Sequence, residues 1–288
     1  MRIALVTGAS SGMGRESVLQ IADIGRGLDE IWVVARRKER LLELERKSRR
    51  PLRLLAIDLT DPDGQAQLRE LLARLRPDVK WLVNAAGYGK LAPVGKTAER
   101  DELGMIRLNC EALCLVTRLV LPYMSDNSRI IQYASAAAFL PQPGFAVYAA
   151  SKSFVLSYSR ALNEELRPRA IAVTAVCPGP VRTEFFDVAD TGSPMPFWKK
   201  PFMTSAHRVV KKALRDSMMG RSVSVCGLPM KLFALLCRLL PTGFLLRGYA
   251  GISSCLPVSR KPADDRKRTG VHPSADTHRN IGAEGSRP

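Results

Sequence analysis

The chain has 288 residues, with 44 Lys and Arg against 27 Asp and Glu, which gives a formal net charge of +17. Hydrophobic residues make up 46% of it, enough for a large buried core, which excludes a wholly disordered, a collagen-like or a disulfide-scaffold protein. The excess basic charge leaves four interpretations open: a nucleic-acid partner, an anionic membrane surface, a phosphorylated ligand, or a basic surface that is only solvated.

Short apolar runs alternate with helical patterns along the first 227 residues. We expect strands at 2–7, 30–35, 52–57, 80–85, 128–134, 170–176 and 221–227, and helices at 15–24, 38–47 and 62–75. Because the strands are almost continuously hydrophobic, both of their faces should be covered, as in a parallel sheet. The alternation therefore predicts an α/β fold, a Rossmann-like doubly wound parallel sheet of about seven strands with helices on both faces.

A glycine-rich loop joins the first expected strand to the first expected helix. It reads Thr7-Gly8-Ala9-Ser10-Ser11-Gly12-Met13-Gly14. Gly8 permits a tight turn, Gly12 a close approach of the backbone to a pyrophosphate, and Gly14 close packing of helix on strand. The helix N-terminus adds free N–H groups and a partial positive charge. An ordinary Gly-rich turn is the alternative, but the strand and helix on either side favour a dinucleotide phosphate site.

Two arginines, Arg36 and Arg37, follow the second expected strand. Dinucleotide-binding folds that prefer NAD usually carry Asp or Glu there, to hold the ribose 2′-hydroxyl. Here no carboxylate would repel a 2′-phosphate, and two guanidiniums can bind it. We therefore expect NADP(H) as the preferred cofactor, with NAD(H) as the alternative. The competing interpretation is that the arginines only begin a solvated basic helix.

A second group of residues follows the strand expected at 128–134. Ser135 stands at the C-terminal end of that strand, where ligands of open α/β sheets bind. Tyr148 and Lys152 are four residues apart on one expected helix and share a face, and an ammonium near a phenol lowers the phenol pKa. Each residue alone has a structural alternative. Together they predict proton transfer to or from a carbonyl/alcohol pair while a nicotinamide transfers hydride.

These motifs, in this order, resemble those of the short-chain dehydrogenase/reductase family in its single-domain form. The resemblance covers residues 2–227 and rests on the glycine loop, Asn84-Ala85-Ala86-Gly87, Asn109, Ser135, Tyr148, Lys152, and Pro178-Gly179 before Thr183. It implies that Tyr148 is the general acid/base and that Lys152 binds the nicotinamide ribose. It also implies that Ser135 orients the substrate oxygen and that Asn109 supports a water-linked proton relay.

The resemblance also implies a set of cofactor contacts. Asp58 matches the family's adenine-contacting aspartate, with a helix-capping role as the alternative. Ser11 replaces a basic residue that many NADPH-dependent members carry, so Arg36 and Arg37 would supply most of the 2′-phosphate recognition. The full expected set is Gly8, Ser10, Ser11, Gly12, Met13, Gly14, Arg36, Arg37, Asp58, Asn84, Ala85, Gly87, Tyr148, Lys152, Pro178, Gly179, Val181 and Thr183.

The C-terminal part carries the expectations about substrate and surroundings. We place a short-chain dehydrogenase/reductase domain at 1–227, including a substrate lid at about 184–203 whose Phe, Met and Trp content favours a hydrophobic ketone or alcohol, such as a steroid or fatty chain. The alternative is that these side chains only close the core. Residues 228–251 are apolar but interrupted by basic residues, so the segment 228–257 is either a membrane-surface helix or a lid or subunit contact. Residues 258–288 resemble a disordered tail.

The remaining composition bears on compartment and partners. The six cysteines lack CxxC pairing, which predicts reduced thiols and a cytoplasmic protein, with membrane association left open; Cys177 is expected to be a packing residue. The three histidines form no zinc pattern, so we expect no metal, and no nucleic-acid motif is present.

The function expected from the sequence is an NADP(H)-dependent oxidoreductase, a carbonyl reductase or alcohol dehydrogenase for a small molecule. By resemblance it would assemble as a homodimer or homotetramer. The alternatives are a non-catalytic NADP(H)-binding sensor or scaffold, and a 3-oxoacyl-type reductase of the same family.

Overall fold

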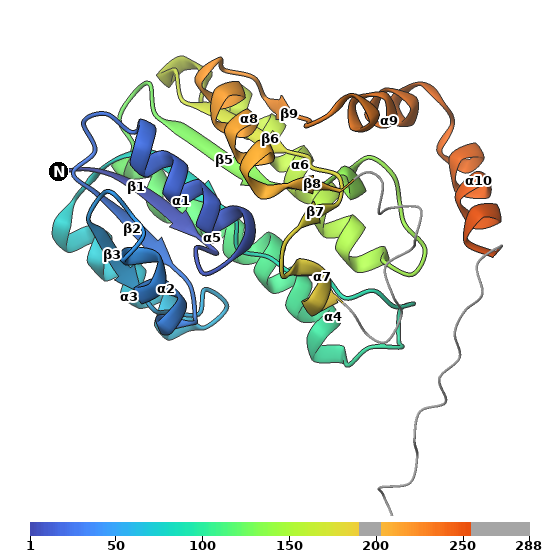
Figure 1. Ribbon diagram of the computed structural model, residues 1–288, viewed down its shortest axis with the longest axis horizontal. Helices are drawn as coiled ribbons and strands as arrows, with labels where there is room; N and C mark the ends of the chain where they lie inside the picture. Colours follow the sequence, from blue (N-terminus) through green and yellow to red (C-terminus); the bar gives the residue numbers. More distant parts are fainter. Residues whose placement is uncertain (190–202, 255–288) are drawn as a thin grey trace, which may run out of the picture. The chain divides into compact units, whose positions relative to one another are not determined.

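The centre of the fold is a parallel β-sheet. The computed structural model describes residues 1–189 and 203–254. Within these residues the sheet's seven strands are β1 (Arg2–Thr7), β2 (Glu30–Val34), β3 (Leu52–Leu55), β4 (Asp78–Asn84), β5 (Arg129–Tyr133), β6 (Ala172–Val176) and β9 (Val223–Ser224). Their order across the sheet is β3-β2-β1-β4-β5-β6-β9, and every neighbouring pair is parallel (Figure 1). The order reverses between β1 and β4, where Thr7 pairs with Asn84, so a ligand crevice is expected at these strand ends.

Helices connect the strands and cover both faces of the sheet. They are α1 (Gly12–Ile24), α2 (Lys38–Glu45), α3 (Pro62–Leu75), α4 (Glu99–Ile106), α5 (Leu113–Val120), α6 (Ala146–Glu165) and α8 (Ala206–Met218). The short helix α7 (Phe185–Ala189) precedes α8, and α9 (Leu228–Leu239) and α10 (Thr242–Ser254) follow the last strand of the sheet. Two short strands, β7 (Val181–Arg182) and β8 (Thr204–Ser205), pair beside the main sheet. The predicted doubly wound α/β fold is confirmed.

The alternation of side chains along β1 shows why both faces are apolar. Ala4 and Val6 point into a core shared with α1, α2 and α8. Ile3 and Leu5 point into the opposite core, shared with α3, α5 and α6. Successive strand residues face opposite sides, so a strand covered on both sides must be hydrophobic throughout.

The strand predictions were accurate in the centre of the sheet and looser at its edges. The strand expected at 170–176 begins only at Ala172, because Ala170 has φ 51° in the left-handed region and closes the preceding turn. The strand expected at 221–227 shrinks to two residues at the sheet edge, since only Val223 and Ser224 find partners on β6.

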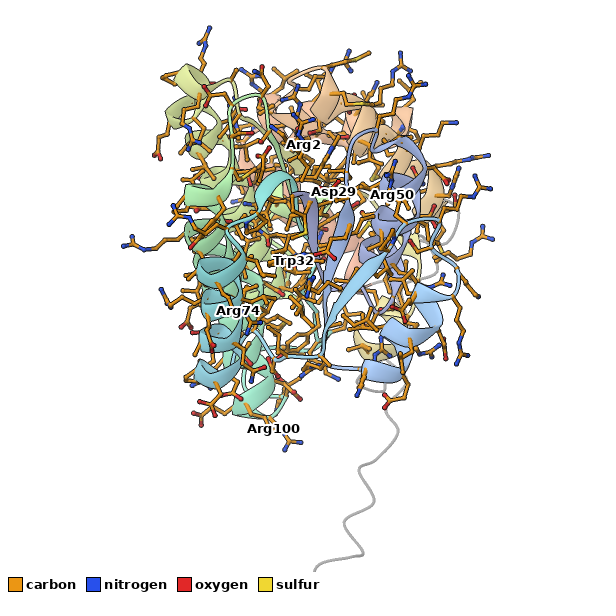
Figure 2. All side chains as sticks on the ribbon, turned by 90° about the vertical axis from the view of Figure 1, so that its left-hand side faces the viewer. Arg2, Asp29, Trp32, Arg50, Arg74 and Arg100 are labelled. Atoms are coloured by element: carbon orange, nitrogen blue, oxygen red, sulfur yellow. The ribbon has the colours of Figure 1, made fainter. Side chains whose placement is uncertain are left out.

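Some of the arginines that contribute to the basic charge also hold the fold together through hydrogen bonds and ion pairs. Arg50 donates to the Ala22 and Leu28 carbonyls at 2.9 and 2.7 Å, and Arg53 pairs with Glu30 at 2.8 Å. Trp32 is fully buried (Figure 2). Other arginines, such as Arg74 and Arg100, extend from helices into solvent (Figure 2).

The tail expected at 258–288 lies outside the described residues, and so does 190–202 of the expected lid. Among residues 1–189 and 203–254, none of the helices combines the length and the apolar character that crossing a membrane requires.

Candidate active site

A first cavity of about 330 Å³ opens at the carboxyl ends of β1, β2, β4 and β5. Most of the expected cofactor residues line it: Gly8, Ser10, Ser11, Gly12, Met13, Gly14, Arg36, Arg37, Asp58, Ala85, Gly87, Tyr148, Lys152 and Thr183. The structure thus brings together residues from six separate segments of the sequence. Pro178, Gly179 and Val181 line a second cavity instead, and Asn84 lines neither of the two.

The glycine loop is shaped for close approach. Gly8 has φ +66°, and a Cβ on it would lie 2.6 Å from the Ala86 nitrogen. Gly12 has φ +53°, and its Cβ would lie 3.4 Å from Cγ2 of Thr183. The Ser11 side chain makes no capping hydrogen bond in the described chain, and the first turn of α1 carries no acidic residue. Such a helix N-terminus suits a pyrophosphate, because its N–H groups and partial positive charge face the cavity.

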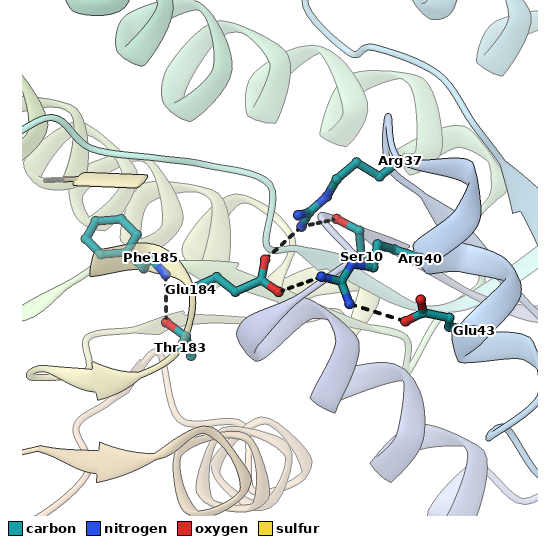
Figure 3. A network of polar contacts seen from close by, with 7 residues as sticks. All are labelled: Ser10, Arg37, Arg40, Glu43, Thr183, Glu184 and Phe185. Atoms are coloured by element: carbon teal, nitrogen blue, oxygen red, sulfur yellow. Dashed lines mark hydrogen bonds and ion pairs between the residues drawn. The ribbon is translucent and has the colours of Figure 1, made fainter. Parts of the chain in front are cut away.

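The arginines after β2 lie in a network of charges (Figure 3). Nη2 of Arg37 donates to Oγ of Ser10 at 3.2 Å and to Oε2 of Glu184 at 3.1 Å. Nη2 of Arg40 pairs with Oε1 of Glu184 at 3.5 Å, and Nη1 pairs with Glu43 at 3.3 Å. Sequence reasoning missed Arg40 and Glu184, because nothing along the chain signals that these two residues, 144 positions apart, form an ion pair.

Asp58 lies at the outer edge of the first cavity. Its Oδ1 accepts hydrogen bonds from the backbone and hydroxyl of Thr60 at 2.9 and 2.7 Å, and its Oδ2 faces Arg36 at 3.5 Å. Burial raises the pKa of Asp58, but these hydrogen bonds and the Arg36 charge together hold it below its usual value. The helix-capping alternative belongs to Asp61, whose side chain accepts from the Asp63 N–H at the start of α3.

Hydrogen bonds from buried side chains hold the loop that follows β4 in place. Asn84 is buried and donates to Oγ1 of Thr117 and Oε1 of Gln132, each at 3.0 Å, so its side chain braces the sheet. Oγ1 of Thr7 accepts from the N–H groups of Ala85 and Ala86 at 3.1 and 3.2 Å. Thr7 therefore positions the wall of the cavity, a role the sequence analysis did not assign.

Tyr148 and Lys152 project from one face of α6, and Tyr148 lines both cavities. Nζ of Lys152 donates to the Tyr133 carbonyl at 2.8 Å and lies 5.7 Å from the centroid of the Tyr148 ring. Ser135 lies at the end of β5, lines the second cavity, and accepts from the Ala137 N–H at 3.1 Å.

Burial is the largest influence on the pKa values of Tyr148 and Lys152. It raises the pKa of Tyr148 to about 12, although the hydrogen bond with Ser135 acts to lower it. Burial also lowers the pKa of Lys152 to about 8. The shift of the Tyr148 pKa is opposite to the lowering that the Tyr–x3–Lys spacing predicts, since the ammonium is directed to a carbonyl and the phenol is desolvated.

Asn109 lies in a π-helical turn, Arg107–Ala112, between α4 and α5. Its Oδ1 accepts from the Tyr88 N–H at 3.0 Å, and its Nδ2 donates to the Tyr88 carbonyl at 2.9 Å and to Oγ of Ser151 at 3.0 Å. A Cβ on Gly87 would lie 2.8 Å from this Oδ1 and 3.3 Å from Nζ of Lys152. The wider turn thus holds the Asn109 amide beside Lys152, and π turns recur at functional sites.

The second cavity, about 450 Å³, is mostly apolar and adjoins the first at Tyr148. Phe185 and Phe186 from the described start of the expected lid line it, and so do Met230 and Phe233 from α9. Gly89 packs closely against two residues that line this cavity, because a Cβ there would lie 2.8 Å from both Phe145 and Tyr148. Sequence reasoning missed Gly89, which carries no motif signal.

Cys177 precedes Pro178, which lines this cavity, and is fully buried. Burial raises the pKa of its thiol to about 12, so the thiolate that a nucleophile requires is disfavoured. The packing role expected for it agrees with this environment.

A doubly wound sheet with a glycine-rich crevice, joined at a Tyr–Lys pair to an apolar cavity, defines a dinucleotide-dependent oxidoreductase. A family model described as short chain dehydrogenase matches residues 2–192. The chain belongs to this family, and with it to the NAD(P)-dependent dehydrogenases and reductases.

Particular relatives differ in substrate. Sulfoacetaldehyde reductase 2 of Chromohalobacter salexigens is 35% identical over 192 residues, 64% of this chain and 74% of that protein. A very-long-chain 3-oxoacyl-CoA reductase of Aspergillus terreus is 35% identical over 183 residues, 60% of this chain but only 51% of that protein. Among solved structures, a short-chain dehydrogenase from Sphingobium yanoikuyae in complex with NADPH has a TM-score of 0.67 and 28% identity, covering 92% of this chain and 99% of that one.

Proposed function

We propose that the chain reduces a ketone or aldehyde to an alcohol, and runs the reverse reaction, by hydride transfer with NADP(H). The observation that carries the proposal is the position of Tyr148, which lines both the first cavity and the apolar second cavity. Ser135 faces the second cavity and Lys152 the first. A carbonyl held in the second cavity and a nicotinamide held in the first would therefore meet at the phenol.

The first cavity supports a dinucleotide and favours its phosphorylated form. The glycine loop and the start of α1 would hold the pyrophosphate, and Asp58 the adenosine side. Arg36 and Arg37 line the same cavity and would bind a 2′-phosphate, which NAD lacks. The NADPH complex of the Sphingobium relative supports this preference.

When bound, the nicotinamide supplies or accepts the hydride, and the chain's own residues handle the proton. With a pKa near 12 the Tyr148 phenol is protonated at neutral pH and ready to donate its proton to the carbonyl oxygen. Ser135 would hydrogen-bond the same oxygen, while Lys152 and Asn109 position the ribose side of the site. A protonated phenol is the form that reduction needs, whereas oxidation needs phenolate, and the ratio of the two cofactor forms sets the direction that runs.

The second cavity favours a hydrophobic substrate of steroid or fatty type. Its walls include Leu140, Phe145, Phe186 and Phe233, with Gln142 as a polar side chain at one side. A 3-oxoacyl substrate is the second candidate, favoured by the likeness to the very-long-chain 3-oxoacyl-CoA reductase. We assign residues 1–227 to the catalytic domain and α9, which lines the second cavity, to the substrate side of the site.

Replacing Tyr148 with Phe tests the proposal. Y148F should lower kcat for ketone reduction by about 10²-fold or more and leave NADPH binding, measured by fluorescence titration, within about twofold. Y158F is the matched control, because Tyr158 lies on the same helix and lines neither cavity. Unchanged turnover in Y148F would refute the assignment, whereas lost NADPH binding in Y148F would point to a cofactor-holding role.

A further inference from the structure

Helix α9 exposes an unusual row of leucines. Leu228, Leu232, Leu235 and Leu239 are 79, 55, 50 and 68% exposed. Their spacing of four, three and four residues places them on one face of the helix. Burying large apolar side chains is the main gain of folding, so a continuous exposed row indicates a surface that something else covers.

The side of α9 next to this row faces the second cavity. Pro229, Met230 and Phe233 line the cavity from this helix, and Met230 packs on Gly179, where a Cβ would lie 2.9 Å from its Cγ. Leu232 belongs to both the row and the cavity, and Leu236, which also lines the cavity, is still 41% exposed. The leucine row therefore begins at the rim of the cavity.

Basic residues flank the leucine row. Lys231 and Arg238 are both exposed and seven residues apart, which places them together along one side of the leucines. The combination of exposed apolar and basic side chains continues into α10 with Phe244, which is 68% exposed, and with the exposed Arg247. Residues 228–254 contain no Asp or Glu. An apolar row beside exclusively positive charge complements an anionic, apolar surface.

We propose that α9 lies on an anionic membrane surface, with its leucine row in the acyl boundary and Lys231 and Arg238 at the lipid headgroups. Amphipathic helices of this composition bind lipid surfaces without crossing them. A second copy docked through the same segment fits the row less well, because two such segments would bring like charges together without an acidic partner.

The contact also places the cavity rim against lipid. A hydrophobic ketone dissolved in the bilayer would reach Tyr148 past α9 without crossing water. This second step rests on the proposed function, whereas the membrane contact does not.

Vesicle cosedimentation of the full chain tests the proposal. The wild type should sediment with vesicles of phosphatidylcholine and phosphatidylserine, and at least about tenfold less with phosphatidylcholine alone. The double variant L235S/L239S should lose at least about tenfold in affinity, and neither residue lines a cavity. K231Q/R238Q should lose the preference for phosphatidylserine.

The matched control is M218S/M219S, which replaces two residues that are 52 and 53% exposed at the end of α8. Its binding should equal that of the wild type. Wild-type protein that stays in solution with both vesicles, or L235S/L239S that binds like the wild type, would overturn the proposal. So would a leucine variant that changes only the oligomeric state in sedimentation velocity, which would assign the row to a second copy. Turnover of a water-soluble ketone without vesicles reports on the proposed function separately.

Discussion

Glu184 places a negative charge inside the cavity that we assign to NADP(H). Its carboxylate pairs with Arg37 at 3.1 Å and with Arg40 at 3.5 Å, and Glu184 lines the first cavity together with Arg37. A 2′-phosphate that binds Arg37 must take over these pairs. The substitution E184Q removes the competing charge, so it should tighten the binding of NADPH and leave that of NADH unchanged.

The expected size follows from the exposure of the pairs. The side chains of Arg37 and Glu184 are 47 and 42% exposed, which makes each ion pair worth about 0.5 kcal/mol. Two such pairs amount to about 1 kcal/mol, or about fivefold in a dissociation constant. The effect should shrink as salt is added, because exposed charges are screened.

Steady-state kinetics with both cofactors measures this effect. KM for NADPH should fall about fivefold in E184Q, while KM for NADH stays within about twofold. E43Q is the control, since Glu43 also pairs with Arg40, at 3.3 Å, but lines neither cavity. A higher KM for NADPH in E184Q would refute the reasoning, because Glu184 would then be holding Arg37 in place for the phosphate.

Two further changes probe the proton-transfer side. Because burial lowers the pKa of Lys152 to about 8, its ammonium is present below that pH, and kcat/KM for ketone reduction should fall as the pH rises through about 8. A profile that stays flat well above pH 8 would contradict this. Gly89→Ala places a Cβ 2.8 Å from Phe145 and Tyr148, so kcat should drop at least about tenfold with KM for NADPH unchanged. Gly243→Ala, where a Cβ meets nothing within 4 Å, is the control, and equal activity of both alanine variants would exclude the packing argument.

The alternation of strands and helices in a parallel sheet was predictable because the central strands are apolar on both faces. Ile3 to Val6 carry that pattern at the centre of the sheet, and the predicted helix at 62–75 matches α3 because Asp61 caps it and Pro62 begins it. The edges were less predictable. Pairing of β9 depends on how many of its residues reach β6, and hydrophobic periodicity does not encode that number.

Motif residues of the site were predictable because each carries a local geometric requirement. Gly8 and Gly12 both adopt positive φ, and Tyr148 and Lys152 share a helical face. The supporting residues were not predictable. Thr7 and Glu184 act through contacts made only after distant segments meet, so their residue types alone carried no signal.

The roles of the basic residues, too, become clear only from contacts made in the fold. Residues 36–53 hold nine Lys and Arg against three Glu, and along the sequence they form one basic cluster next to a phosphate site. In the fold, Arg36 and Arg37 face the first cavity, but Arg50 satisfies two backbone carbonyls and Arg53 neutralises Glu30. Removing Arg50 or Arg53 would leave buried or half-buried polar groups without hydrogen-bond partners. Such a substitution should lower the stability of the fold and leave cofactor binding unchanged. Net charge therefore indicates the class of ligand only after each guanidinium has been assigned to the protein or to the cavity.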